Sequence, residues 1–177
     1  MDQERALLNH FLAALAYRTQ KALRGAPETF ADFQVGNNTR TPHELIWHMT
    51  GVLGYARTFF TGGTWRPEKE AKLIDDVKRF HDLLEDLGRI FLSDAPMNGI
   101  TAKQMLHGPL ADAMTHVGQI AMLRRLAGAP IAPENFIRAD IQSNNLSENQ
   151  PSPAAPDPGW KPDLPPATPG KGLSDDW

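Results

Sequence analysis

Apolar residues recur at helical spacing in four long segments of the chain, and almost no segment alternates with a period of two. The clearest stripe lies within residues 68–91 and steps by four, three, four, three and four residues. It consists of Leu73, Val77, Phe80, Leu84, Leu87 and Phe91. Such a stripe covers one face of a helix and is typical of helices that pack against other helices. The sequence therefore predicts an all-α fold.

Residues that cap helices indicate where two of the other helices begin and end. The first helix is expected over about residues 2–24, with Gly25 as its stop. The second opens with the sequence TPHE at residues 41–44, which is a capping box with proline at the first helical position. This helix is expected to continue to about Phe60 and to end at the two glycines 62–63.

The fourth helix is expected over residues 110–128. It could begin as early as Thr101, which forms a second capping pair with Gln104, if Pro109 kinks the helix rather than starting it. Four helices of about 20 residues each predict a four-helix bundle.

The length and the distribution of proline predict one domain and a tail. A chain of 177 residues, 41% of them hydrophobic, can bury one core but is short for two domains. Residues 1–141 are expected to form the bundle. Eight of the 15 prolines lie within residues 150–177, so no helix can form there. Residues 142–177 are therefore expected to form an extended, Pro-rich C-terminal tail that is accessory to the bundle.

Charge and composition exclude several classes of function. The net charge of -3 and the scattered Lys and Arg residues give no support for a nucleic-acid or membrane partner. The chain has no cysteine, so His, Asp and Glu are the remaining candidate metal ligands. Its start lacks the basic region of a signal peptide, and no apolar run reaches the roughly 18 residues that span a bilayer. A soluble, cytoplasmic protein is expected.

Three polar residues on two of the predicted helices could bind a metal ion. Asp112 and His116 are four residues apart, so their side chains can converge on one point. His48 lies between Leu45 and Val52 on the expected buried face of the second helix. A divalent cation would neutralise a buried carboxylate and use both imidazoles. We predict His48, Asp112 and His116 as metal ligands, with a satisfied buried polar network as the alternative.

Five further side chains have weaker expected roles. His107 is expected to cap the fourth helix or to line a pocket mouth. Gln119 continues the face of the predicted ligands and is expected to orient a ligand or to bind a neighbouring helix. Trp47 and Tyr55 are expected to line a pocket or to pack in the core. His43, the second residue of its helix, is expected to face solvent.

The sequence ELIWHM around His48, and HVGQ followed by LRRLAG in the fourth helix, resemble the DinB-like superfamily of bacterial metal-binding four-helix bundles. The resemblance extends over about residues 2–141. It implies that His48 and His116 match two of the family's three histidines, whereas Asp112 stands where the family has the third. The implied cofactor is one divalent ion of Zn, Ni, Mn or Fe, held by two histidines and one aspartate.

The resemblance also implies an activity. Members of the family include thiol S-transferases, in which a metal ion activates a low-molecular-weight thiol such as glutathione, bacillithiol or mycothiol. The expected function is therefore a metal-dependent transferase, or a hydrolase, that acts on a small-molecule substrate. The alternative is a non-catalytic helical bundle, as a monomer or a homodimer, with a structural metal or a buried polar network. The sequence identifies no catalytic residue beyond the metal ligands.

Overall fold

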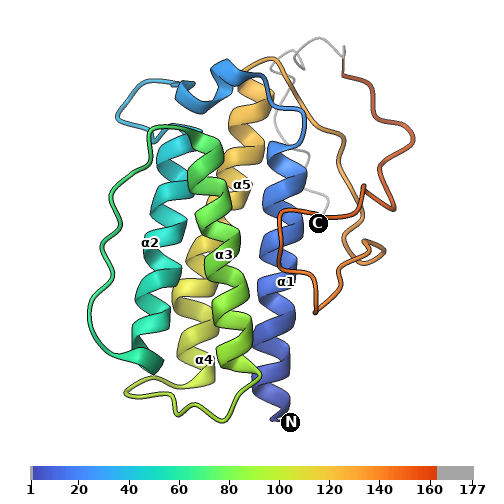
Figure 1. The fold of residues 1–177 in the computed structure, drawn as a ribbon. Coiled ribbons are helices and arrows are strands. Elements are labelled where there is room, and N and C mark those ends of the chain that lie inside the picture. The colour runs from blue at the N-terminus through green and yellow to red at the C-terminus, as the bar shows by residue number, and fades with distance from the viewer. Residues whose placement is uncertain (1, 163–177) are drawn as a thin grey trace, which may run out of the picture.

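The computed structural model describes residues 2–162 and has the architecture of a four-helix bundle (Figure 1). The first three long helices are α1 (Gln3–Leu23), α2 (Pro42–Thr61) and α3 (Leu73–Phe91). The fourth is assembled from α4 (Ala102–Met105), the π-helical turn η2 (Leu106–Leu110) and α5 (Ala111–Leu126). A short 3-10 helix, η1 (Glu28–Asp32), lies between α1 and α2. The predicted all-α bundle is confirmed.

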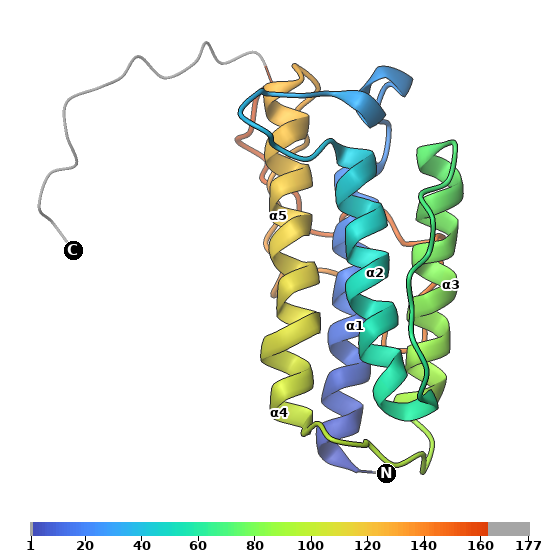
Figure 2. The same ribbon diagram turned by 90° about the vertical axis from the view of Figure 1, so that its left-hand side faces the viewer.

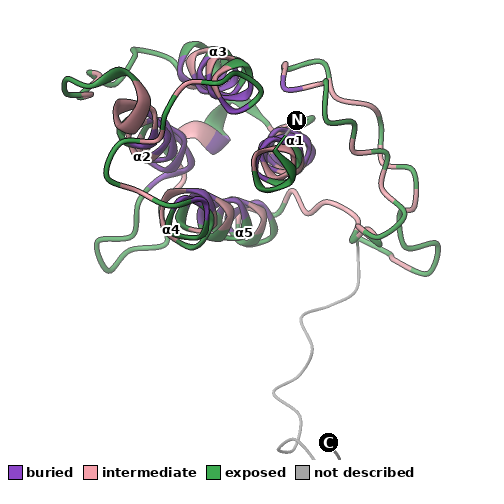
Figure 3. Cartoon of the chain, turned by 90° about the horizontal axis from the view of Figure 1, so that it is seen from below, coloured by how far each residue is buried: buried purple, intermediate pink, exposed green. Residues whose placement is uncertain are grey.

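Each helix of the bundle packs against two neighbours, as Figure 3 shows along the bundle axis. α2 contacts α3 and α5, and α1 contacts α3 and α5. The predicted stripe of α3 faces the core, where Phe80, Leu84 and Leu87 are fully buried. Over residues 2–162 no helix is long and apolar enough to cross a membrane.

Local sequence accounts for the starts of α2 and α4, whereas the end of α1 also involves a distant residue. Both predicted capping boxes are present, one between Thr41 and Glu44 and the other between Thr101 and Gln104. Gly25, which follows α1, has a φ of 64° that a residue with a side chain rarely adopts. At the end of α1 the buried guanidinium of Arg124 donates to the carbonyls of Ala22, Leu23 and the capping residue Arg24, at 3.2–3.3 Å.

A kink at Pro109 separates α4 from α5, so of the two alternatives predicted for this helix the earlier start after Thr101 is the one observed. Proline has no N–H to donate, and its ring clashes with the carbonyl four residues before it. The helix widens into the π-helical turn η2, in which Gly108 has a non-helical ψ of -107°. The chain then continues as α5, with Asp112 in its first turn.

α3 begins at Leu73, five residues after the predicted start at Glu68. The backbone N–H of Glu70 donates to the buried carboxylate of Asp76 at 3.0 Å, and the carbonyl of Glu68 accepts from Arg79 at 2.7 Å. These contacts hold the preceding residues in an extended conformation. Because α2 and α3 run in the same direction, the connecting loop, residues 62–72, returns along the length of the bundle (Figure 2).

The described residues after α5, 127–162, are irregular and lie against the bundle (Figure 1). Leu146 is buried beside Gly88, where an added Cβ would lie 2.4 Å from a Leu146 methyl carbon. The carbonyl of Ser143 accepts from the Asn9 side chain at 2.9 Å. Contacts with the bundle therefore continue past residue 141. Part of the predicted tail, residues 163–177, lies outside the described residues.

Candidate metal centre

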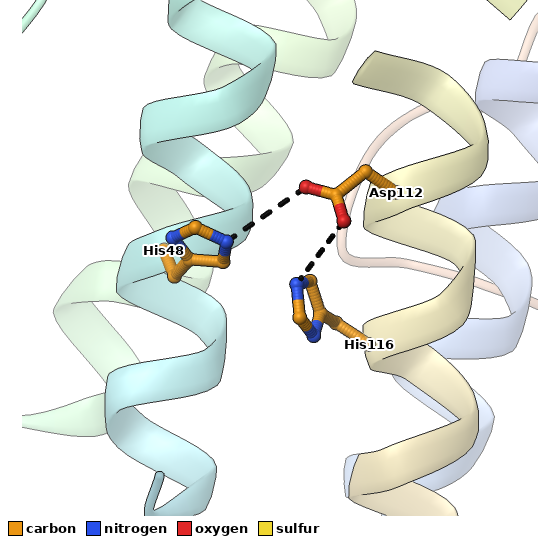
Figure 4. Close-up of side chains that lie close together, drawn as sticks. All are labelled: His48, Asp112 and His116. Carbon is orange, nitrogen blue, oxygen red and sulfur yellow. Dashed lines mark ion pairs between the residues drawn. The ribbon is translucent and has the colours of Figure 1, made fainter. Parts of the chain in front are cut away.

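The three predicted ligands meet between α2 and α5 (Figure 4). His48 extends from the middle of α2, and Asp112 and His116 extend from successive turns of α5. One donor atom from each residue lies within 4.8 Å of the other two. The predicted convergence of these side chains is therefore confirmed, and the three residues could hold a metal ion.

The three side chains approach one another without forming normal hydrogen bonds. Nε2 of His48 lies 3.8 Å from Oδ2 of Asp112, and Nε2 of His116 lies 3.5 Å from Oδ1 of the same carboxylate. Hydrogen bonds from N–H to oxygen are usually about 2.7–3.2 Å long. The arrangement thus differs from the directly hydrogen-bonded polar network that was the alternative prediction.

The spacing of the donor atoms is close to what a bound ion requires. Ligands at 2.0–2.2 Å from a first-row divalent ion lie about 2.8–3.6 Å from each other. Nε2 of His116 and Oδ1 of Asp112, 3.5 Å apart, fall in this range, and Nε2 of His48 lies 3.8 Å from the other carboxylate oxygen, Oδ2. A set of one donor atom from each residue spans up to 4.8 Å, so binding of an ion would draw the side chains closer together. Asp112 is the exposed member of the three. Two imidazoles and one carboxylate suit Zn, Ni, Mn or Fe.

Gln119 fixes the orientation of the His116 ring. Nδ1 of His116 lies 2.9 Å from Oε1 of Gln119, and an amide oxygen only accepts hydrogen bonds. In the neutral ring the proton is therefore on Nδ1, and the lone pair on Nε2 points toward Asp112. A lone pair and a carboxylate oxygen repel each other unless a proton or cation lies between them. Gln119 thus has the predicted orienting position.

The three candidate ligands differ in their exposure. The side chain of His116 is 9% exposed, that of His48 is 30% exposed and that of Asp112 is 48% exposed. The site therefore extends from the core of the bundle to its surface. Burial lowers the pKa of His48, and the positive charge of Arg40 lowers it further, although the carboxylate of Asp112 acts in the opposite direction. A lowered pKa keeps this imidazole neutral, which is the form that binds metals.

A pocket of about 880 Å³ opens onto the outer side of the site. Its lining includes His48 and Asp112, and three structural elements contribute the rest: α2, the loop 62–72 and the turn η2. His107 lines this pocket, which is one of the two roles predicted for it. Trp47 and Tyr55 also line it and are exposed rather than part of the core.

The prediction that His43 faces solvent is wrong. Its side chain is buried, and Nε2 lies 2.8 Å from Oδ2 of Asp76 in α3. The signal for this contact was present in the sequence, because Asp76 is three residues after Leu73 and four before Phe80, on the apolar stripe of α3. An acidic residue at such a position needs a buried partner.

Comparison of the chain with family models, with curated proteins and with solved structures gives no match. The fold and the site by themselves define an all-α bundle with a cluster of two histidines and one aspartate beside a pocket. A specific function therefore rests on these residues and on the resemblance of the sequence motifs.

Proposed function

We propose that the chain is a metal-dependent enzyme of the DinB-like kind, in which His48, Asp112 and His116 hold one divalent cation. The reaction we favour is transfer of a low-molecular-weight thiol to an electrophile. The observation that carries the proposal is the convergence of three donor atoms, not hydrogen-bonded to one another, at the wall of a pocket.

Each residue of the site has a distinct part in this proposal. A divalent ion held there would act as a Lewis acid and lower the pKa of a thiol or a water molecule toward neutrality. Asp112 contributes the negative charge of the ligand set, and Gln119 keeps Nε2 of His116 directed into the site. His48 and Asp112 border the pocket, so a substrate would approach from their side.

Access to the pocket favours a catalytic site over a structural one. Structural zinc sites usually have four protein ligands and no open position. Here the cluster within the described residues has three potential ligands, and two of them face the pocket. The preference for thiol transfer over hydrolysis rests on the resemblance to the DinB-like superfamily.

The proposal is tested by metal analysis followed by an activity assay. Protein purified without a histidine tag is expected to contain about one divalent ion per chain by mass spectrometry, from the three-ligand site. Glutathione, bacillithiol and mycothiol are then each offered with a chloronitrobenzene electrophile, and conjugation is followed by absorbance. Conjugation should stop on treatment with a chelator and return when metal is restored.

Two results would contradict different parts of the proposal. Absence of metal from the purified protein, and failure to bind added Zn²⁺, Ni²⁺, Mn²⁺ or Fe²⁺, would reject the metal centre itself. A bound metal without conjugation of any thiol would reject thiol transfer, and hydrolysis of an ester panel would then be the reaction to measure.

A further inference from the structure

The pocket beside His48 has mostly apolar walls. They are formed by Trp47, Val52, Tyr55, Trp65, Pro67 and Pro109. Trp47 and Tyr55 remain 37% and 58% exposed, so the described part of the chain leaves much of their surface uncovered. Removing aromatic surface from water is favourable, and a pocket of about 880 Å³ is large enough for a ring system.

Two charged side chains of opposite sign line this pocket within the described residues. Among the described residues that line it, Asp112 is the only carboxylate, and the proposed metal centre uses that group. Arg66 is the only lysine or arginine in the same lining. A guanidinium binds carboxylates and phosphates through charge-assisted hydrogen bonds. Arg66 is exposed at the pocket, so its guanidinium is accessible to an anionic group of a ligand bound there.

Both chain neighbours of Arg66 are held against α2. An added Cβ at Gly54 would lie 2.1 Å from ring atoms of Trp65, which shows how closely the indole packs on the helix backbone. On the other side, the carbonyl of Pro67 accepts a hydrogen bond from Nε1 of Trp47 at 2.8 Å. The backbone of Arg66 is thus fixed at the pocket before a ligand arrives, which reduces the entropy lost on binding.

We infer that the pocket binds a small organic anion with a flat apolar body, whose anionic group is received by Arg66. We further infer that this anion is the electrophilic substrate, and that step rests on the proposed function. The binding itself depends only on the aromatic walls and Arg66, so it is measurable without metal and without turnover.

The test compares 2-naphthoate with its neutral counterpart 2-naphthamide in ligand-observed NMR titrations of the full chain. The protein is first treated with a chelator, so that no metal can hold the carboxylate. Naphthoate is expected to bind about tenfold more tightly than naphthamide, as one charge-assisted contact provides. Acetate, which has the charge without the apolar body, is expected to bind far more weakly than either.

Two variants separate the contributions of charge and of the aromatic walls. Arg66→Met should abolish the preference for naphthoate, whereas Arg125→Met, at an exposed position of α5 away from the pocket, should leave it intact. Tyr55→Ala should weaken both naphthalene ligands by about two- to tenfold. Equal binding of the two ligands to the unaltered protein would overturn the inference, as would an unchanged preference in Arg66→Met. If the unaltered protein bound naphthoate as expected but bound no metal, that result would count against the proposed function and not against this inference.

Discussion

The imidazole of His43 and the carboxylate of Asp76 form a buried pair, with Nε2 and Oδ2 2.8 Å apart. The same carboxylate accepts from the backbone N–H of Glu70 at 3.0 Å and from the guanidinium of Arg79. A single acidic side chain therefore connects α2, α3 and the loop 62–72, which also forms one wall of the pocket.

Replacing Asp76 by alanine is expected to lower the free energy of unfolding by about 3–5 kcal/mol, because His43 and Arg79 lose a buried partner. Urea denaturation measures this change. Hydrogen exchange at the Glu70 amide should become faster at the same time. The matched control is Asp75→Ala, one residue earlier and exposed, which should change stability by less than about 0.5 kcal/mol. Equal effects of the two variants would contradict this role for Asp76.

His81 should make the protein less stable in mild acid. It is buried, Nδ1 donates to the carbonyl of Leu146, and burial lowers its pKa to about 4. Between pH 6.5 and about 4 the unfolded chain binds a proton that the folded chain does not, so stability falls as pH falls. The loss from this residue between pH 7 and 5 is about 2 kcal/mol.

Urea titrations of the unaltered protein and of His81→Gln at pH 7 and 5 measure that contribution. The variant is expected to be less stable at pH 7 but to lose about 2 kcal/mol less than the unaltered protein on acidification. Parallel losses in the two proteins would mean that His81 does not titrate in this way.

The metal ligands are tested by single substitutions followed by calorimetric titration with Zn²⁺. His48→Ala or His116→Ala removes one of three donors and is expected to abolish stoichiometric binding. Asp112→His should keep binding and change the order of preference among Zn, Ni, Mn and Fe, because a neutral nitrogen replaces a charged oxygen. His10→Ala, an exposed histidine of α1, is the control and should bind as the unaltered protein does.

Gln119→Ala should weaken metal binding by about 10- to 100-fold, because the His116 ring loses the acceptor that fixes its proton on Nδ1. Competition with a chromophoric chelator measures the affinity. Gln3→Ala, at the exposed start of α1, provides a control for loss of a glutamine elsewhere. Unchanged affinity in the Gln119 variant would show that the ring orientation does not depend on this amide.

A chain that ends at Ile141 is expected to keep a cooperative thermal transition, since the four helices retain most of the core. Its midpoint should be lower, because the truncated chain lacks the buried side chain of Leu146, which is worth about 1.5–3 kcal/mol. Leu146→Ala in the full chain estimates that contribution separately. Loss of the cooperative transition on truncation would show that the later residues are required for folding.

Features that depend on neighbouring residues could be predicted from the sequence. The two capping boxes and the kink at Pro109 each involve groups within a few positions of one another. The start of α3 could not be predicted in this way. The sequence after Glu68 is compatible with a helix, but contacts of Asp76 and Arg79 with the preceding backbone keep it extended. Tertiary contacts override helix propensity there.

The candidate site was predictable to a similar extent. Helical spacing alone places Asp112 and His116 on one face and His48 on the expected buried face of the second helix. The resemblance then matched His48 and His116 to ligands of the family. The complete pocket could not be predicted from the sequence, because Arg66 and the residues around it belong to a loop without periodicity. Its position depends on the parallel course of α2 and α3, which no local pattern encodes.

The contact between Arg124 of α5 and the end of α1 joins segments that are synthesised at different times. This side chain binds the carbonyl of Ala22, which is made 102 residues earlier. On the ribosome α1 emerges before α5, so the carbonyl of Ala22 lacks this donor until α5 has left the exit tunnel. The carboxyl end of α1 is thus completed only after α5 has been made, although α1 itself is translated about 100 residues earlier.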